Sequence, residues 1–413
     1  MLVRIPIKKL RIGMYIHEFC GSWYDHPFWH TAFLLDKDDD LRAIQSTCIK
    51  DVWIDTDKGL NVEGGKAEKA VAAKVDNTLA QANTNNNTSK KIASEIGVHQ
   101  EAARAAKILV QSKQAVASMF HEARMGKALN ASDAMPLVEE IASSLMRNSG
   151  AVISLARLKN KDNYTYMHSV AVSALMMALA RQLELTDKQV HQAGMAGLMH
   201  DIGKTKTPLD IINKPTNLTD AEFSVIKNHT VEGHQILLES HGMSDIVLHV
   251  CLQHHEKLDG SGYPARLANE DIDMFAKMGA VCDVYDAITS VRAYKKGWEP
   301  AESIRKMAEW GNHYFDRQIF YAFVKSVGIY PIGSLVRLAS DHLGVVIEQT
   351  DSSLLTPILM VFFSIKANCR MMPEILDLSK PRCTDKIVSH EDPDKWGIND
   401  VQALWSGVAA SIC

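Results

Sequence analysis

A helical pattern of apolar residues extends from about Ser94 to about Val327, and no other feature of this sequence constrains the fold as strongly. Segments such as EAARAAKILVQSKQAVASMFHEARM and PLVEEIASSLMRNS place apolar residues three and four positions apart. That spacing puts them on one face of a helix. Pro136 lies near an expected helix start, with Ser132 or Asp133 as candidate N-caps. The pattern predicts a mainly α fold.

Short strands are expected before this helical region, in a small β-rich domain over residues 1–60. The segment VRIPI alternates apolar and polar or chain-breaking residues, and Trp53 lies in a second strand-like run. Trp23, Trp29 and Trp53 are expected to pack this domain. A polar, Asn-rich stretch, NTNNNTSKK, follows a segment that could be helical, and it is interpreted as linker.

Strands are also expected after the helical region. SLVRLAS, GVVIEQ and PILMVFFSI are short apolar runs separated by turn residues. The apolar segment Leu354–Ile365 is too short for a membrane span and contains Pro357, so a strand is the better interpretation. The tail beyond Met371 is polar and expected to be irregular. The expected domain organisation is 1–60 β-rich domain, 61–93 linker in which a helix is possible, 94–149 helical connector, 150–328 helical domain and 329–413 β-containing extension with an irregular tail.

Composition excludes several classes of protein. The 413 residues are 46% hydrophobic and 23% charged, and the net charge of −4 excludes a strongly basic nucleic-acid coat. Seven scattered cysteines without a CxxC pair argue against a disulfide framework and suit a reducing cytoplasm. The sequence contains neither a signal-peptide block at its start nor an apolar run of about 18 residues. A cytoplasmic protein without a membrane span is expected.

Histidines are concentrated in one part of the chain: nine of the 17 lie from His168 to His255. The segment GLMHDIGK ends an apolar run with the pair His200-Asp201. An imidazole can bind one metal ion, and a carboxylate with two oxygens can bridge two. Such a pair alone is more often an exposed helix end, so it is a weak signal by itself.

Two further segments strengthen the signal. HHEKLDGSGYP, residues 254–264, joins two histidines to a turn-rich loop with flexible glycines and a proline. In AVCDVYDAITSVRAYKK, Asp283 and Asp286 are three residues apart and share a helix face. The cations after them could bind phosphate, although each one alone is more often a surface charge.

Together these segments resemble the HD-GYP family, a branch of the HD metal-dependent phosphohydrolases. The His200-Asp201 pair matches the HD motif, and Gly262–Pro264 match GYP. Lys214-Pro215 and the spacing from His229 to Gly233 also match. The resemblance covers about half of the chain, roughly residues 150 to 365. Residues 1–60 more faintly resemble an uncharacterised domain often found ahead of HD-GYP domains.

The resemblance implies a bacterial signalling phosphodiesterase that hydrolyses cyclic di-GMP to linear pGpG and in some members to GMP. It implies two divalent metal ions, iron or manganese, bridged by Asp201. The implied ligands are His168, His200, Asp201, His229, His254, His255 and Asp283. Catalytic roles would fall to Asp201 and Lys204, and substrate contacts to Lys204, Asp286, Arg292, Tyr294 and Lys295. The nitrogen and oxygen ligands themselves also admit cobalt, nickel and zinc. His191, His234, His241 and His249 match no ligand position and are expected to pack or face solvent.

One departure from the family concerns the number of metals. Members with three metals carry a glutamate four residues before the first ligand histidine, where this chain has Tyr164. Residues four apart share a helix face, but a neutral phenol is a poor substitute for a carboxylate. A binuclear centre is therefore predicted.

Other functions remain open at this point. The chain could be a slow or inactive module that senses cyclic dinucleotides through a homodimer or a signalling partner, or an HD phosphohydrolase for another nucleotide. Residues 1–60 are expected to be dispensable for chemistry, so that a fragment starting near Ser94 would retain activity.

Overall fold

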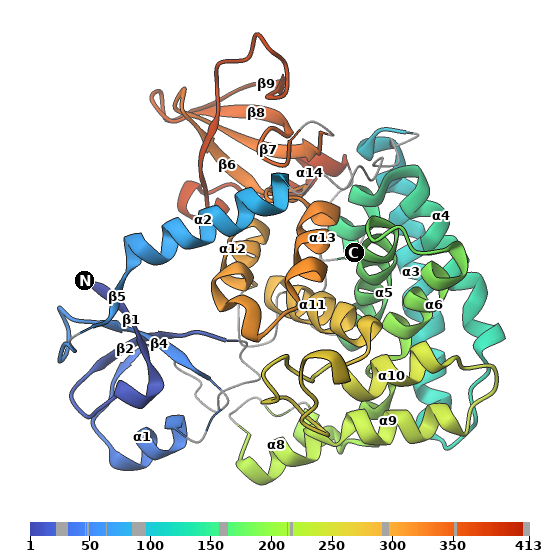
Figure 1. Ribbon diagram of the computed structural model, residues 1–413. Coiled ribbons are helices and arrows are strands. Elements are labelled where there is room, and N and C mark those ends of the chain that lie inside the picture. Colours follow the sequence, from blue (N-terminus) through green and yellow to red (C-terminus); the bar gives the residue numbers. More distant parts are fainter. Residues whose placement is uncertain are drawn as a thin grey trace.

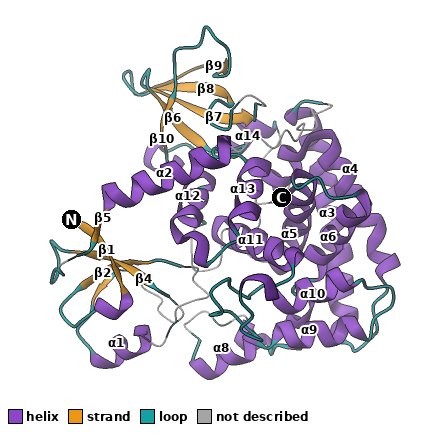
Figure 2. Ribbon diagram, in the orientation of Figure 1, coloured by secondary structure: helices purple, strands orange, loops and turns teal. Residues whose placement is uncertain are grey.

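The computed structural model describes residues 1–21, 32–45, 47, 49–62, 64–84, 96–156, 164–212, 214, 218–290, 297–350 and 353–407. A helical body lies between two small antiparallel sheets, one from each end of the chain (Figure 1; Figure 2). This arrangement confirms the predicted mainly α fold with β-rich ends. No helix in the described ranges is long and apolar enough to cross a bilayer.

The N-terminal sheet has the strand order β3-β2-β4-β1-β5. Its strands are β1 (Leu2–Pro6), β2 (Tyr15–Phe19), β3 (Phe33–Leu34), β4 (Asp51–Asp55) and β5 (Lys66–Ala67), with η1 (Ile7–Lys9) and α1 (Asp38–Gln45) between them. Ile5, Met14, Ile16 and Ile54 form part of a small separate core. The sequence predicted that Trp53 would pack in this core. Trp53 instead packs with the helical body. Trp23 and Trp29 lie outside the described residues.

The segment expected to be a linker contains a long helix, α2 (Glu68–Thr84). This helix contacts α12 (Pro300–Trp310) and α13 (Arg317–Val327) and extends from the N-terminal sheet toward the C-terminal sheet (Figure 1). Arg305 Nη1 lies 2.7 Å from Asp76 Oδ1, and the hydroxyl of Tyr321 donates to Gln81 Oε1 at 2.9 Å. Because α2 is held along its length, it is part of the packed structure. The Asn-rich stretch after it lies outside the described residues.

The helical body is built around α5 (Tyr164–Gln182), in which every residue from Met167 to Ala180 is buried. It contacts α3 (Val98–Arg124), α4 (Ala131–Ala156), α6 (Asp187–Met199), α11 (Met274–Thr289) and α13. The remaining elements are η4 (Ile202–Lys206), α7 (Leu209–Ile212), α8 (Asp220–Lys227), α9 (His229–Leu238), α10 (Asp245–Gln253), η5 (Asn269–Asp271) and η6 (Gly311–His313).

Two details of α4 differ from the sequence prediction. The helix begins at Ala131, and the side-chain oxygen of Asn130 accepts from Ser132 N at 3.0 Å. Asn130 therefore occupies the capping position, and the prediction of Ser132 or Asp133 as N-cap is wrong. The helix is also broken at Asn148, whose φ of −163° and ψ of 104° are extended.

The C-terminal sheet has the order β10-β6-β7-β8-β9. It comprises β6 (Leu335–Leu338), β7 (His342–Glu348), β8 (Ile358–Ser364), β9 (Cys369–Asp377) and β10 (Ile387–His390), followed by η7 (Pro393–Trp396) and α14 (Val401–Ser406). The strand expected within Leu354–Ile365 is confirmed as β8. The prediction of an irregular tail is wrong, because β9 pairs with β8 as an edge strand with mostly exposed side chains. An exposed edge strand has no buried face to give it an apolar alternation.

Candidate metal centre

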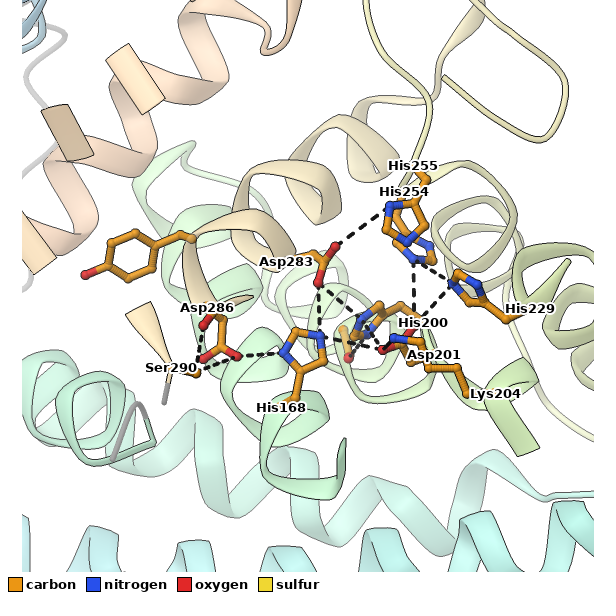
Figure 3. Close-up of polar contacts among 12 residues, drawn as sticks. His168, His200, Asp201, Lys204, His229, His254, His255, Asp283, Asp286 and Ser290 are labelled. Atoms are coloured by element: carbon orange, nitrogen blue, oxygen red, sulfur yellow. Dashed lines mark hydrogen bonds and ion pairs between the residues drawn. The ribbon is translucent and has the colours of Figure 1, made fainter. Parts of the chain in front are cut away.

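The side chains predicted as metal ligands come from five helices and meet at one place in the body (Figure 3). His168 lies on α5, His229 begins α9, and Asp283 lies on α11. The pair His200-Asp201 follows α6, and the pair His254-His255 follows α10. The structure therefore brings together residues that are more than 100 positions apart in sequence.

Local sequence explains how α6 delivers the His200-Asp201 pair. The helix begins with a capping box, in which Gln189 N donates to Thr186 Oγ1 at 3.3 Å and Thr186 N donates to Gln189 Oε1 at 3.1 Å. Near its other end, Gly197 lies against α5, where a Cβ atom would approach Ser173 Cα to 2.7 Å. Because α5 and α6 approach so closely, the rings of His168 and His200 are 5.1 Å apart.

A second close backbone contact positions α9. A Cβ atom on Gly203 would lie 1.9 Å from the carbonyl oxygen of His229 and 2.4 Å from Gly233 N. No side chain fits there, so the turn after Asp201 packs directly on the first turns of α9. This contact fixes the distance between Asp201 and His229, whose Oδ1 and Nε2 atoms are 3.3 Å apart.

The two oxygens of Asp201 face two different groups of ligands (Figure 3). Oδ2 lies 3.4 Å from His200 Nε2 and 3.6 Å from His168 Nε2. Oδ1 lies 3.3 Å from His229 Nε2 and 3.9 Å from His254 Nε2. One pocket is thus formed by His168, His200 and Asp283 and the other by His229, His254 and His255, with Asp201 between them.

The buried polar atoms of these pockets suit a metal ion. Among the described residues, His200 Nε2, Asp201 Oδ1 and Asp283 Oδ2 are buried without a hydrogen-bond partner of acceptable geometry. Leaving such atoms unsatisfied costs about 1–3 kcal/mol each, and cations bound in the two pockets would satisfy them. Imidazole nitrogens with carboxylate oxygens are the ligands of divalent transition metals.

The histidines are also in the tautomer that metal binding requires. Nδ1 of His200, His229 and His254 lies 2.8, 2.7 and 3.0 Å from the backbone carbonyls of Gly197, Ile226 and Val250. A carbonyl oxygen only accepts, so each Nδ1 carries the proton and each Nε2 offers its lone pair.

Comparison with known proteins places the chain in a family. A model described as "HD domain" matches residues 150–319, and one described as "Domain of unknown function (DUF3391)" matches residues 2–134. A cyclic di-GMP phosphodiesterase of Pseudomonas aeruginosa is 49% identical over 412 residues, covering 100% of this chain and 97% of its own length. The chain belongs to the HD-GYP family.

Other relatives match less than half of this chain. A cyclic di-GMP phosphodiesterase of Vibrio cholerae is 35% identical over 42% of this chain and 38% of its own length. A 3'3'-cGAMP-specific phosphodiesterase of the same organism is 34% identical over 46% of this chain and 42% of its own length. Among solved structures, Bd1817, an HDG"Y"P protein from Bdellovibrio bacteriovorus, covers 79% of this chain and 99% of its own with 19% identity and a TM-score of 0.46.

The electrostatics of this HD-GYP site favour ionised carboxylates, and these carboxylates in turn raise the pKa of His200 against the effect of its burial. Burial opposes ionisation of Asp201, but Lys204 and His200 outweigh it and hold its pKa well below the usual range. For Asp283, burial is likewise outweighed by His168, and its pKa is lowered. Burial, together with the neighbouring His200 and His229, lowers the pKa of His254 to about 3. Asp201 and Asp283 are therefore ionised and His254 is neutral at neutral pH, the forms in which they can bind a metal ion.

The HD-GYP resemblance implied a substrate contact for Asp286, and the geometry favours another role. Asp286 is buried, and its Oδ2 lies 2.6 Å from Nδ1 of His168. Ser290 Oγ lies 3.5 Å from the same oxygen. A carboxylate behind the ring nitrogen orients a ligand histidine and raises its basicity. This contact fits a residue that positions His168.

Several HD-GYP positions cannot be placed. Arg292, Tyr294 and Lys295 lie outside the described residues, as does the side chain of Tyr164. The histidines without a ligand position belong to none of the groups around Asp201, and none of them is buried: His191, His234, His241 and His249.

One residue of the site escaped the sequence analysis. Glu256, directly after His255, is buried and accepts hydrogen bonds from Ala265 N at 2.7 Å and Leu267 N at 3.1 Å. It closes the loop that contains the GYP motif, because its two partners follow the motif. Gly262 permits this fold, because a Cβ there would lie 2.5 Å from Glu256 Cα. The sequence signal that could have identified Glu256 is its position between a histidine pair and a glycine-rich turn.

Proposed function

We propose that this chain hydrolyses cyclic di-GMP to linear pGpG at the two pockets that share Asp201. The observation that carries the proposal is the division of the Asp201 oxygens, with Oδ2 facing His168 and His200 and Oδ1 facing His229 and His254. The relative that is 49% identical along nearly its whole length is named a cyclic di-GMP phosphodiesterase. Family membership makes the chain a phosphodiesterase of the HD type.

The residues present fit two divalent ions, and iron or manganese is our proposal for their identity. One would be held by His168, His200 and Asp283 and the other by His229, His254 and His255, with Asp201 common to both. When bound, such ions act as Lewis acids toward phosphate oxygens and lower the pKa of water to near neutrality.

The chain itself supplies the charge and the orientation. Lys204 Nζ lies 2.5 Å from Asp201 Oδ2, at the edge of the site, with its side chain 19% exposed. A cation there can meet a phosphate oxygen or give a proton to the departing oxygen. Asp286 holds the ring of His168, so that its Nε2 stays directed at Asp283 and Asp201.

Substrate contacts are proposed for the cationic segment after α11. Arg292 and Lys295 would bind phosphate oxygens or guanine edges, and Tyr294 would stack or hydrogen-bond. A cytoplasmic location is proposed with this function, because Cys20, Cys251, Cys282, Cys369 and Cys383 are all free thiols, as in a reducing compartment. A homodimer or a signalling partner remains part of the proposal.

Hydrolysis of a small panel of cyclic dinucleotides tests the function. Apo-protein reloaded with Mn²⁺ or Fe²⁺ would be incubated with cyclic di-GMP, 3'3'-cGAMP and cyclic di-AMP, and the products separated by chromatography. We expect linear pGpG from cyclic di-GMP at the highest kcat/KM, and no product from Asp201→Asn. If another dinucleotide were hydrolysed at a higher kcat/KM, that dinucleotide would replace cyclic di-GMP as the proposed substrate. Tight binding without turnover would favour a sensing module.

A further inference from the structure

The N-terminal sheet contacts the catalytic domain through a cluster of polar residues on α12. Trp53 Nε1 donates to Glu309 Oε1 at 2.7 Å. Arg4 Nη1 donates to the carbonyl oxygen of Glu309 at 3.1 Å and to its Oε1 at 3.2 Å. Lys306 forms an ion pair with Glu18. The side chains of Arg4 and Glu309 are only 12% and 10% exposed, so this cluster holds the sheet in one place on the helix.

Lys50 lies at the edge of this interface, directly before β4. Its carbonyl oxygen accepts from Ile7 N at 2.8 Å. The next residue, Asp51, is bound by Arg4, with Oδ2 at 2.8 Å from Nη2 and 3.1 Å from Nε. The backbone of Lys50 is therefore held through its carbonyl oxygen and through Asp51, and its ammonium group forms an ion pair with Asp259 of the catalytic domain.

Asp259 belongs to a segment that we call the GYP loop, residues 256–264. Its Oδ1 accepts from Ser261 N at 3.0 Å and from Ser261 Oγ at 2.5 Å. Burial opposes ionisation of Asp259, but the hydrogen bonds from Lys50 and Ser261 outweigh it and lower its pKa. Asp259 thus joins the loop's internal turn to the N-terminal sheet.

The other end of the GYP loop is attached to the metal pocket. Tyr263 N donates to the carbonyl oxygen of His255 at 3.2 Å. The ring of Tyr263 stacks on the ring of His255, with centroids 4.7 Å apart and planes at 27°. A displacement of the loop would therefore also move His255, a proposed ligand in the second pocket.

Packing around Lys50 is incomplete. The ion pair between Lys50 and Asp259 therefore links the N-terminal sheet to the GYP loop here. A small hollow between the sheet and the catalytic domain is lined by Lys50, Asp51, Lys257, Asp259, Trp310 and Tyr314. The polar cluster holds the sheet on α12, but the hollow lies between the sheet and the loop. The Lys50 side chain reaches Asp259 alongside this hollow.

We propose that Lys50 is a positioning residue through which the N-terminal domain holds the GYP loop, and with it His255, in the geometry of the second metal pocket. The proposal gives the N-terminal domain a role in the proposed function. Any effect of Lys50 on turnover therefore rests on that function. It also opposes the expectation that residues 1–60 are dispensable, because a fragment starting near Ser94 would lack Lys50.

Hydrogen–deuterium exchange of full-length protein tests the link without substrate. In Lys50→Met we expect amide exchange in residues 256–264 to accelerate about two- to fivefold, the range of a half-exposed ion pair. The Mn²⁺ concentration for half-saturation of the second pocket should rise by a similar factor. Lys50→Arg should restore both values. Lys58→Met is the matched control, because Lys58 lies in the same domain and its contacts, Asp55 at 3.7 Å and the ring of Tyr15, also lie in that domain.

A double variant separates this link from general destabilisation. If Lys50 acts through Asp259, Lys50→Met combined with Asp259→Asn should exchange no faster than Asp259→Asn alone. Loop exchange and Mn²⁺ half-saturation equal to those of Lys58→Met would overturn the proposal, as would additive effects in the double variant. Neither readout uses cyclic di-GMP, so loss of the substrate assignment would leave this test intact.

Discussion

Removal of the Asp286 carboxylate tests whether this residue serves a metal ligand or the substrate. In Asp286→Ala, Nδ1 of His168 loses the acceptor that lies 2.6 Å away. Both side chains are 2% exposed or less, so water cannot easily replace the lost partner. The ring of His168 would then be free to turn away from Asp283 and Asp201.

The expected magnitude follows from that contact. A buried hydrogen bond to a charged group contributes about 1.5–3 kcal/mol, which corresponds to roughly ten- to hundredfold in an equilibrium constant. Loss of a residue that orients a metal ligand costs about 10–100-fold in metal affinity or activity. We therefore expect the Mn²⁺ affinity of one pocket to fall within this range, and Asp286→Asn, which keeps an acceptor, to show a smaller loss.

Equilibrium dialysis followed by elemental analysis would measure bound metal per chain. Asp271→Ala is the control, because Asp271 is an exposed carboxylate in η5, away from the ligands. The reasoning is refuted if Asp286→Ala binds both ions as tightly as the wild-type chain and only KM for cyclic di-GMP rises. That result would instead support the substrate contact implied by the sequence.

Four further predictions concern the same site. Asp201→Ala should abolish turnover and reduce bound metal while circular dichroism keeps its helical signal; wild-type activity would exclude the bridging role. Gly203→Ala should lower the melting temperature and the metal content, because its Cβ would meet the backbone of His229 at 1.9 Å; an unchanged protein would show that α9 can move. Arg292→Ala and Lys295→Ala should weaken substrate binding about tenfold or more with metal content unchanged; metal loss in either would contradict their assignment. Anomalous diffraction at the metal edge should show two ions per chain, and a third near Tyr164 would refute the binuclear prediction.

Much of the site was accessible from sequence because its chemistry is carried by short motifs. Adjacent His200 and Asp201, the histidine pair before the GYP motif and the carboxylates of α11 each have a recognisable local pattern. The resemblance to HD-GYP proteins supplied their convergence, which spacing alone does not show. Helical periodicity predicted the body, since burial of one helix face leaves a repeat in the sequence.

Features without a local signal needed the tertiary structure. The strand β9 was missed because its side chains are exposed at a sheet edge and follow no apolar alternation. The packing of α2 on α12 and α13, the contact of Trp53 with Glu309 and the ion pair from Lys50 to Asp259 all join distant parts of the chain. No local pattern encodes the partner of a side chain across an interface.

The two carboxylates of α11 show where sequence ends and tertiary structure begins. Their three-residue spacing determined by itself that Asp283 and Asp286 share one helix face. Only the placement of α5 against α11 decided their roles. The ring of His168 lies between them, with Nε2 at 3.0 Å from Asp283 Oδ1 and Nδ1 at 2.6 Å from Asp286 Oδ2. One carboxylate therefore faces the proposed metal pocket and the other lies where it can orient the histidine, because an imidazole presents its two nitrogens in different directions.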